Sequence, residues 1–225
     1  MEFASRYPDV PIPDIPYHTL ILQNAADIPD RPAFIDGPSG RTLTYRDVES
    51  GARRIASSLA RRGFRKGDVF AIVLPNVPEY ALVFHGVLML GGVVTTANPL
   101  YTVDELAFQL SDTRARFVVT LATFLDKVGA AARRAGTEEI FVLGEAEGAT
   151  SIAALLQGDG IVPEVAIYPR TDLAVLPYSS GTSGRAKGVM LTHYNLVSIT
   201  RQIDGVGVRT LDENARVLAV LPFFH

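Results

Sequence analysis

Apolar residues recur with the spacing of an amphipathic helix in the stretch that follows Thr44. They fall on one stripe of a helical wheel, which consists of Val48, Ala52, Ile55 and Leu59. Gly63 is a suitable residue to end such a helix, because glycine readily adopts the left-handed conformation of a C-terminal cap. The pattern therefore predicts one long helix that buries a single face.

The residues before this helix follow a different pattern. Four prolines within the first sixteen residues favour an extended arm laid over the body of the protein. Helical signal then runs from about Tyr17 to Ile28, and Pro32–Asp36 with Arg41–Tyr45 has the pattern of a hairpin. We expect residues 1–64 to form the arm, helix and hairpin of a first subdomain.

From Asp68 onward, strand-like and helix-like segments alternate. The strand-like segments are Val69–Leu74, Val93–Ala97, Phe117–Thr120 and Ile140–Leu143. The helix-like segments are Val77–Leu90, a helix opening at Thr102 with a capping box to Glu105, Thr123–Ala135 and Ile152–Leu156. Alternation with continuously apolar strands predicts an α/β fold with a doubly wound, mainly parallel sheet that helices cover on both faces.

Two further boundaries follow from this pattern. We expect residues 65–190 to form the doubly wound subdomain and residues 191–225 to begin the next one. The strand-like run Val217–Leu221 and the hairpin near residues 32–45 should belong to a second, incomplete sheet.

The chain carries a hydroxyl-rich, glycine-punctuated run that ends in a lysine, Tyr178–Gly188. Apolar segments lead into it (Leu173–Pro177) and out of it (Val189–Thr192), and both have the pattern of buried strands. Glycines let the backbone approach an anion closely, while hydroxyls, peptide N–H groups and a lysine supply donors and charge. The run therefore predicts a nucleotide phosphate loop. Its candidate residues are Ser179, Ser180, Gly181, Thr182, Ser183, Gly184 and Lys187.

Other motifs with similar composition do not fit this run. A Walker P-loop needs Ser or Thr after the lysine at the opening of a helix, and here Gly188 follows Lys187. A serine-hydrolase elbow needs a one-residue spacer after the serine, which Ser183-Gly184 lacks. A glycine- and serine-rich hairpin turn without a ligand remains an alternative.

Composition excludes several function classes. The 225 residues are 48% apolar and 20% charged, and a net charge of −3 gives no general attraction to nucleic acid or anionic membranes. The absence of cysteine excludes disulfides and thiolate metal sites and fits a reducing, cytoplasmic location. The apolar run Tyr80–Val94 is shorter than the roughly 20 residues that a bilayer requires, so we expect no integral membrane segment.

The four histidines form no zinc-binding helix pattern, and no metal ligand is predicted in this chain. His85 lies in an apolar helical segment and is expected to pack in the core. His193 follows the segment that leaves the glycine-rich run and is expected to cap the next helix. Thr192 has two interpretations, a hydroxyl near the phosphate loop or an ordinary threonine at a strand end.

The glycine-rich run resembles the phosphate loop of the adenylate-forming superfamily, which includes acyl- and aryl-CoA ligases, firefly luciferases and peptide-synthetase adenylation domains. The resemblance extends over essentially the whole chain. Further segments similar to family signatures are Leu74–Asn76, Ala97–Leu100 and Leu221–His225. Segments similar to 4-coumarate–CoA ligases in particular are Tyr7–Pro13, Pro16–His18 and Leu176–Ser180.

The resemblance implies a reaction. A small-molecule carboxylic acid would attack the α-phosphorus of ATP, and coenzyme A would then displace AMP, with Mg²⁺ bound to the nucleotide. Lys187 would neutralise the departing pyrophosphate, and His225 would lie at the wall of the acyl pocket. Ser183 stands where threonine is usual, and Arg185-Ala186 where an apolar residue and proline are usual. Neither departure removes a donor.

The chain stops at His225, directly after a strand-like run. We therefore expect a fragment whose missing C-terminal part carries the adenine, Mg²⁺ and most acyl contacts. The complete protein would be an AMP-forming acid–thiol ligase, while the fragment would be inactive and would self-associate through unpaired edges. A fatty-acyl-CoA ligase or other adenylating enzyme, a non-enzymatic nucleotide-binding module and a structural α/β interaction domain remain alternatives.

Overall fold

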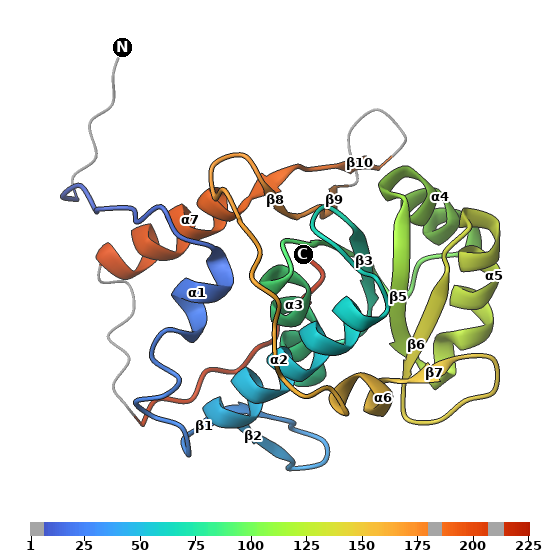
Figure 1. Ribbon diagram of the computed structural model, residues 1–225, viewed down its shortest axis with the longest axis horizontal. Coiled ribbons are helices and arrows are strands. Elements are labelled where there is room, and N and C mark those ends of the chain that lie inside the picture. The colour runs from blue at the N-terminus through green and yellow to red at the C-terminus, as the bar shows by residue number, and fades with distance from the viewer. Residues whose placement is uncertain (1–6, 180–185, 207–213) are drawn as a thin grey trace.

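A computed structural model describes residues 7–179, 186–206 and 214–225 of the chain. Within these residues, the largest sheet has seven strands (Figure 1). In spatial order they are β11 (Leu191–Thr192), β8 (Leu173–Val175), β4 (Val93–Thr96), β3 (Val69–Val73), β5 (Ala115–Leu121), β6 (Glu139–Leu143) and β7 (Thr150–Ser151). All neighbours pair in parallel except β11, which is antiparallel to β8.

Helices cover both faces of this sheet. The helices that follow the hairpin and the strands are α2 (Tyr45–Arg61), α3 (Glu79–Met89), α4 (Val103–Thr113), α5 (Leu125–Ala135), preceded by the short η1 (Ala122–Phe124), and α6 (Ile152–Leu156). Strand β3 shows the two layers: Phe70 and Ile72 pack with α2, α3 and α6, whereas Ala71 and Val73 pack with α4 and α5. The predicted doubly wound, mainly parallel α/β fold is confirmed.

The capping box predicted at Thr102 is confirmed, and the long helix begins directly after Thr44 as expected. Thr44 caps α2 in a reciprocal box with Asp47, and Thr102 caps α4 in the same way with Glu105. Gly86 lets α2 and α3 approach closely, because a Cβ there would lie 2.8 Å from the carbonyl oxygen of Ala52.

The N-terminal segments lie outside the large sheet. Strands β1 (Pro32–Ile35) and β2 (Thr42–Thr44) form the predicted antiparallel hairpin, a separate sheet of two strands among the described residues. Helix α1 (Tyr17–Leu22) is shorter than the predicted stretch to Ile28. Turn hydrogen bonds from the N–H groups of Ala25 and Asp27 replace the helix there, and the stretch contains the turn formers Asn24 and Asp27.

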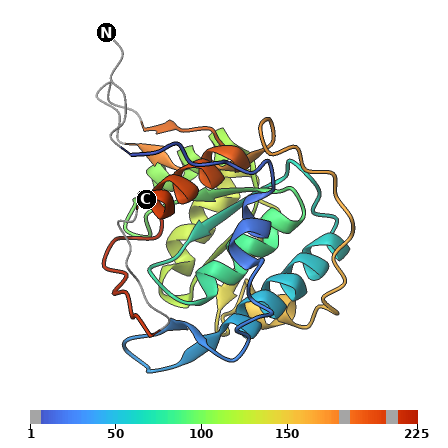
Figure 2. The same cartoon turned by 90° about the vertical axis from the view of Figure 1, so that its left-hand side faces the viewer.

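The arm before α1 packs against α7 (His193–Gly205), and the two run side by side in Figure 2. The side chain of Val10 lies so close to Gly205 that a Cβ there would be 2.2 Å from it. Asp14 pairs with Arg170, whose guanidinium lies 3.8 Å from the ring centre of Tyr194 on α7. The expected extended arm over the body is present.

The predicted strand at Val217–Leu221 was wrong. These residues adopt no regular structure, and Leu218 is 83% exposed. A strand requires a neighbouring strand to accept its backbone hydrogen bonds, and no strand in the described part of the chain pairs with this segment. The subdomain boundaries near residues 64 and 190 stay a prediction.

Candidate functional site

The two ends of the glycine-rich run lie side by side. Strand β9 (Tyr178–Ser179) pairs antiparallel with β10 (Lys187–Gly188), which places Lys187 directly opposite Ser179. Both of these side chains are exposed. The other candidate residues, Ser180, Gly181, Thr182, Ser183 and Gly184, lie outside the described residues. The described part of the predicted loop is therefore the stem of a hairpin.

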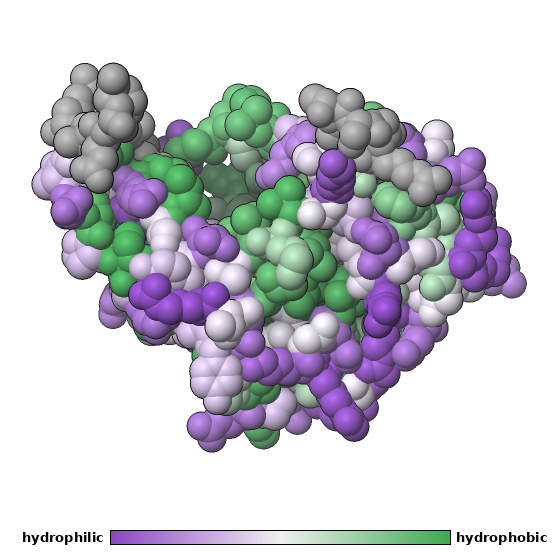
Figure 3. All heavy atoms as spheres, turned by 90° about the horizontal axis from the view of Figure 1, so that it is seen from above, coloured by the Kyte–Doolittle hydropathy of each residue, from purple (hydrophilic) through white to green (hydrophobic). Residues whose placement is uncertain are grey.

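The two flanks of the stem differ. The segment leading in is buried as predicted, with Ala174 fully covered in β8. The buried strand predicted for the segment leading out was wrong at its start, where Val189 is 42% and Met190 67% exposed. Within the described residues β10 pairs with β9 alone, so its outer side lacks a neighbouring strand. Figure 3 views the molecule from above relative to Figure 1, and on this upper face apolar surface is gathered around a hollow.

The stem lies at the edge where parallel strands end. Three adjacent strands, β8, β4 and β3, point their carboxyl ends to the same edge, and ligands of open α/β sheets bind at that edge. The stem follows β8, Thr96 ends β4, and Asn76 follows β3. The topology therefore collects segments far apart in the sequence at one place.

Asn76 and Thr96 hold the C-terminal segment at this edge. The Asn76 side-chain amide donates to the carbonyl oxygens of Ala219 (3.0 Å) and Leu221 (2.8 Å) and accepts from the Phe223 N–H (2.8 Å). The Thr96 hydroxyl donates to the Phe224 carbonyl oxygen at 2.8 Å. This arrangement brings the segment that ends in His225 to the sheet edge, and the His225 side chain remains exposed.

Sequence reasoning missed the role of Asn76. In the sequence it stands out only as part of Leu74–Asn76, a segment that resembles a family signature. A general signal was available, because a polar amide directly after a buried strand and a proline lies at the edge where binding sites occur.

Three histidines from different helices lie near one another, which the sequence did not suggest. The Tyr17 N–H donates to His193 Nδ1 at 3.1 Å, and the rings of His18 and His193 are 6.3 Å apart. The His85 ring stacks against Tyr17 at 6.3 Å. The expected core position of His85 is confirmed, since it is 8% exposed.

Burial of these histidines favours their neutral forms. It lowers the pKa of His18 to about 4, with smaller contributions from His193 and His85. It likewise lowers the pKa of His85 and of His193 to about 4. Each ring has one buried nitrogen without a hydrogen-bond partner among the described residues. No group of three His, Asp or Glu side chains in the described ranges is arranged to hold a metal ion.

The helix cap before His193 is Thr192. The Thr192 hydroxyl accepts from the Asn195 N–H, and the Asn195 side chain accepts from the Thr192 N–H and hydroxyl. The expectation that His193 itself caps this helix was therefore wrong; it is the first helical residue. Of the two interpretations of Thr192, the threonine at a strand end agrees with its contacts. Its hydroxyl bonds Asn195 within the helix cap.

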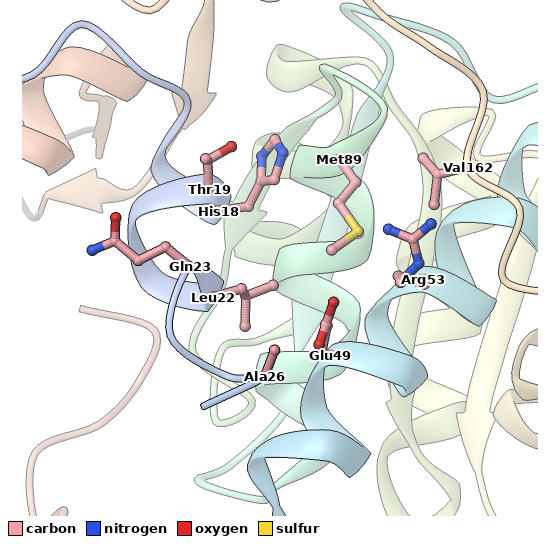
Figure 4. A pocket seen from close by; sticks show the side chains of 9 residues that line it. All are labelled: His18, Thr19, Leu22, Gln23, Ala26, Glu49, Arg53, Met89 and Val162. Atoms are coloured by element: carbon pink, nitrogen blue, oxygen red, sulfur yellow. The ribbon is translucent and has the colours of Figure 1, made fainter. Parts of the chain in front are cut away.

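A groove of about 390 Å³ lies away from the sheet edge, mainly between α1, α2 and α3 (Figure 4). It is lined by His18, Thr19, Leu22, Gln23, Ala26, Glu49, Arg53, Met89 and Val162. Of the predicted site residues that the structure describes, Ser179, Lys187 and His225, none lines it. In the parts of the chain that the structure describes, no helix has the length and hydropathy needed to cross a bilayer.

A model of the AMP-binding enzyme family matches residues 21–225. The chain is 43% identical to 4-coumarate–CoA ligase 5 of Oryza sativa subsp. japonica and 39% identical to 4-coumarate–CoA ligase of Pinus taeda. Each alignment covers 99% of this chain and 42% of the relative, so the chain spans less than half the length of these curated relatives.

Solved structures with the same fold include two CoA ligases. One is a long-chain-fatty-acid-CoA ligase (FadD1) from Archaeoglobus fulgidus, with a TM-score of 0.81 and 25% identity over 91% of this chain and 42% of that one. The other is the anthranilate CoA ligase AuaEII in complex with anthranoyl-AMP, with a TM-score of 0.74 and 27% identity over 83% of this chain and 36% of that one.

Proposed function

The chain belongs to the AMP-binding enzyme family, and on that premise we propose that it provides the ATP-phosphate site of an acid–thiol ligase. The enzyme would activate a carboxylic acid as its acyl-adenylate and transfer the acyl group to coenzyme A. We propose 4-coumarate or a similar aryl acid as the substrate, because the 4-coumarate–CoA ligases named above match 99% of this chain. The observation that carries the proposal is the hairpin stem, in which Lys187 faces Ser179.

The stem suits the proposed role of the loop. Ser179, Ser180, Thr182 and Ser183, with the amides of Gly181 and Gly184, would bind the β- and γ-phosphates of ATP. Lys187 would stabilise the charge that grows on pyrophosphate as it leaves. In phosphoryl transfer, positioning and electrostatic stabilisation of this kind provide most of the catalysis.

We further propose that His225 forms part of the acyl pocket. Its support is the set of hydrogen bonds through which Asn76 and Thr96 hold residues 219–224 at the same sheet edge as the stem. The proposal assigns no residue of this chain to Mg²⁺. The lack of cysteine supports a cytoplasmic location.

The test uses the protein at its full natural length. Lys187→Ala should lower the rate of ATP–pyrophosphate exchange with 4-coumarate at least about tenfold, since the lysine acts mainly in the transition state. Ser183→Ala should cost less, about 1 kcal/mol, because neighbouring amides can replace one neutral donor. Thioester formation from pre-made acyl-adenylate is the internal control, because no pyrophosphate is then present. Exchange in Lys187→Ala within about twofold of wild type would contradict the phosphate-loop assignment.

A second candidate is a ligase for long-chain fatty acids, which the fold shared with the Archaeoglobus fulgidus enzyme favours. The same exchange assay separates the two candidates. Wild-type protein is offered 4-coumarate, benzoate and a long-chain fatty acid in parallel. Exchange with the fatty acid alone would support this second candidate.

A further inference from the structure

Tyr178 is the buried residue of an otherwise exposed stem. Its side chain is 9% exposed, whereas Ser179, Lys187 and Gly188 are exposed. Its hydroxyl donates a hydrogen bond to Oδ2 of Asp112 on α4. Burial, together with Asp112, raises the pKa of the Tyr178 hydroxyl, so the group remains a protonated donor.

The Tyr178 ring reaches across the stem. A Cβ at Gly188, the residue opposite, would lie 3.2 Å from Cε2 and 3.4 Å from the hydroxyl oxygen of Tyr178. The ring of Phe108, also on α4, meets the Tyr178 ring edge-on at 6.3 Å. The ring therefore packs between one strand of the stem and the helix.

A second contact from the same helix holds the chain just before Tyr178. Gln109, three residues before Asp112, donates from Nε2 to the Thr95 hydroxyl oxygen (2.9 Å) and to the Thr96 carbonyl oxygen (3.0 Å). The Thr95 hydroxyl donates to the Leu176 carbonyl oxygen at 2.8 Å. Gln109 and Thr95 are buried, so these bonds form away from water. Helix α4 thus fixes Leu176 indirectly and Tyr178 directly.

We propose that Asp112 is a positioning residue for ATP: through the Tyr178 hydroxyl it sets the direction in which the stem presents Ser179 and Lys187. The inference rests on the proposed function. Without the bond, the stem would still be held by its own short ladder, by the packing of the Tyr178 ring against Phe108 and by the hydrogen bond to Leu176, but the direction of the ring would no longer be fixed by a polar contact. A small displacement of the groups that contact the phosphates should strongly lower the rate of adenylate formation, because catalysis depends on their orientation.

The variants remove the bond from each side in the full-length enzyme. Tyr178→Phe keeps the ring and removes the donor, and Asp112→Ala removes the acceptor. Asp112→Asn keeps an oxygen that can accept the bond from the Tyr178 hydroxyl, so this variant should behave almost like wild type. Asp104→Ala is the matched control, since Asp104 lies on the same helix but pairs with Arg134.

Steady-state exchange kinetics provide the first measurement. Tyr178→Phe and Asp112→Ala should each lower kcat/KM for ATP about tenfold and leave the KM for the acid unchanged. The double variant should be no worse than either single variant, because both remove the same bond. Asp104→Ala should match wild type. Unchanged kcat/KM for ATP, or an equal loss in thioester formation from pre-made acyl-adenylate, would overturn the inference.

Amide hydrogen exchange without nucleotide provides a measurement independent of activity. Asp112→Ala and Tyr178→Phe should accelerate exchange in residues 178–179 and 186–189, and Asp112→Asn and Asp104→Ala should not. If wild-type protein shows no ATP–pyrophosphate exchange, the proposed function fails. Amide hydrogen exchange then still tests whether the Asp112–Tyr178 hydrogen bond holds the stem in place. Equal protection of this segment in all variants would show that Asp112 does not anchor the stem.

Discussion

Two apolar segments of similar composition have opposite structures in this protein. Strand β3 reads Val-Phe-Ala-Ile-Val, and its last four residues are fully buried. The segment Val217–Leu221 reads Val-Leu-Ala-Val-Leu, and its large side chains are 71 to 83% exposed. Both have the composition of a buried strand, yet only β3 is one.

The difference lies in their neighbours. β3 is paired on both sides, by β4 and β5, and has helices on both faces. The described contacts of the C-terminal segment with the sheet edge are side-chain hydrogen bonds from Asn76 and Thr96 and a ring contact between Tyr80 and Phe223. Apolar composition makes a segment able to form a strand, and paired backbone partners decide whether it does.

The largest expected difference between the two regions is in the free energy of unfolding, when a leucine in each is replaced by alanine. Leu74→Ala, directly after β3 at a fully buried leucine, should lower the free energy of unfolding by about 2–5 kcal/mol, because it leaves a cavity. Leu218→Ala, at a leucine that is 83% exposed, should change it by less than about 0.5 kcal/mol. Urea denaturation followed by circular dichroism measures both. Similar losses for the two variants would mean that the C-terminal segment is buried in solution.

Acid should loosen the histidine region between α1, α3 and α7 before it affects β3. The lowered pKa values of His18, His85 and His193, about 4 against 6.5, mean that the unfolded chain binds more protons between these limits. Stability from these groups is therefore complete above about pH 6.5 and is lost as the pH falls towards 4. His193 also faces Asp172, which opposes part of its shift, and Lys66, which adds to it.

The measurement is the free energy of unfolding against pH in wild type and His85→Gln. The variant should lose about 1–3 kcal/mol less than wild type between pH 7 and 4, because it has one buried histidine fewer to protonate. Amide exchange should accelerate first in α1 and α7 and last in β3. Parallel pH profiles for the two proteins would show that protonation of buried His85 does not contribute to this transition.

The smallest expected effect of the exposed C-terminal segment is weak self-association of the 225-residue chain. Exposed apolar residues at Leu218 and Val220 should cause concentration-dependent self-association. Leu218→Lys with Val220→Lys should reduce it, whereas Leu100→Lys, at a leucine that is 78% exposed elsewhere, should not. Sedimentation velocity over a range of concentrations reports this directly. A single monomeric species of wild-type chain at high micromolar concentration would refute the prediction.

Local patterns were sufficient for most of the fold. The alternation after Asp68, the hairpin before α2 and the capping box at Thr102 all depend on residues a few positions apart. Short-range geometry and side-chain periodicity express such features directly in the sequence. The glycine-rich run likewise identified the stem of the candidate site, although residues 180–185 lie outside the described structure.

The tertiary structure alone decided which distant groups meet. The sequence by itself determined the α/β class, most helix and strand positions and the resemblance of its phosphate loop to a family signature. It did not determine that Val217–Leu221 would pair with no strand of the described residues, that three histidines would gather, or that Asp112 would bond Tyr178 across 66 positions. The physical reason is that these contacts depend on how the sheet orders its strands and on what each face covers. Neither leaves a periodic signal in the segments that eventually touch.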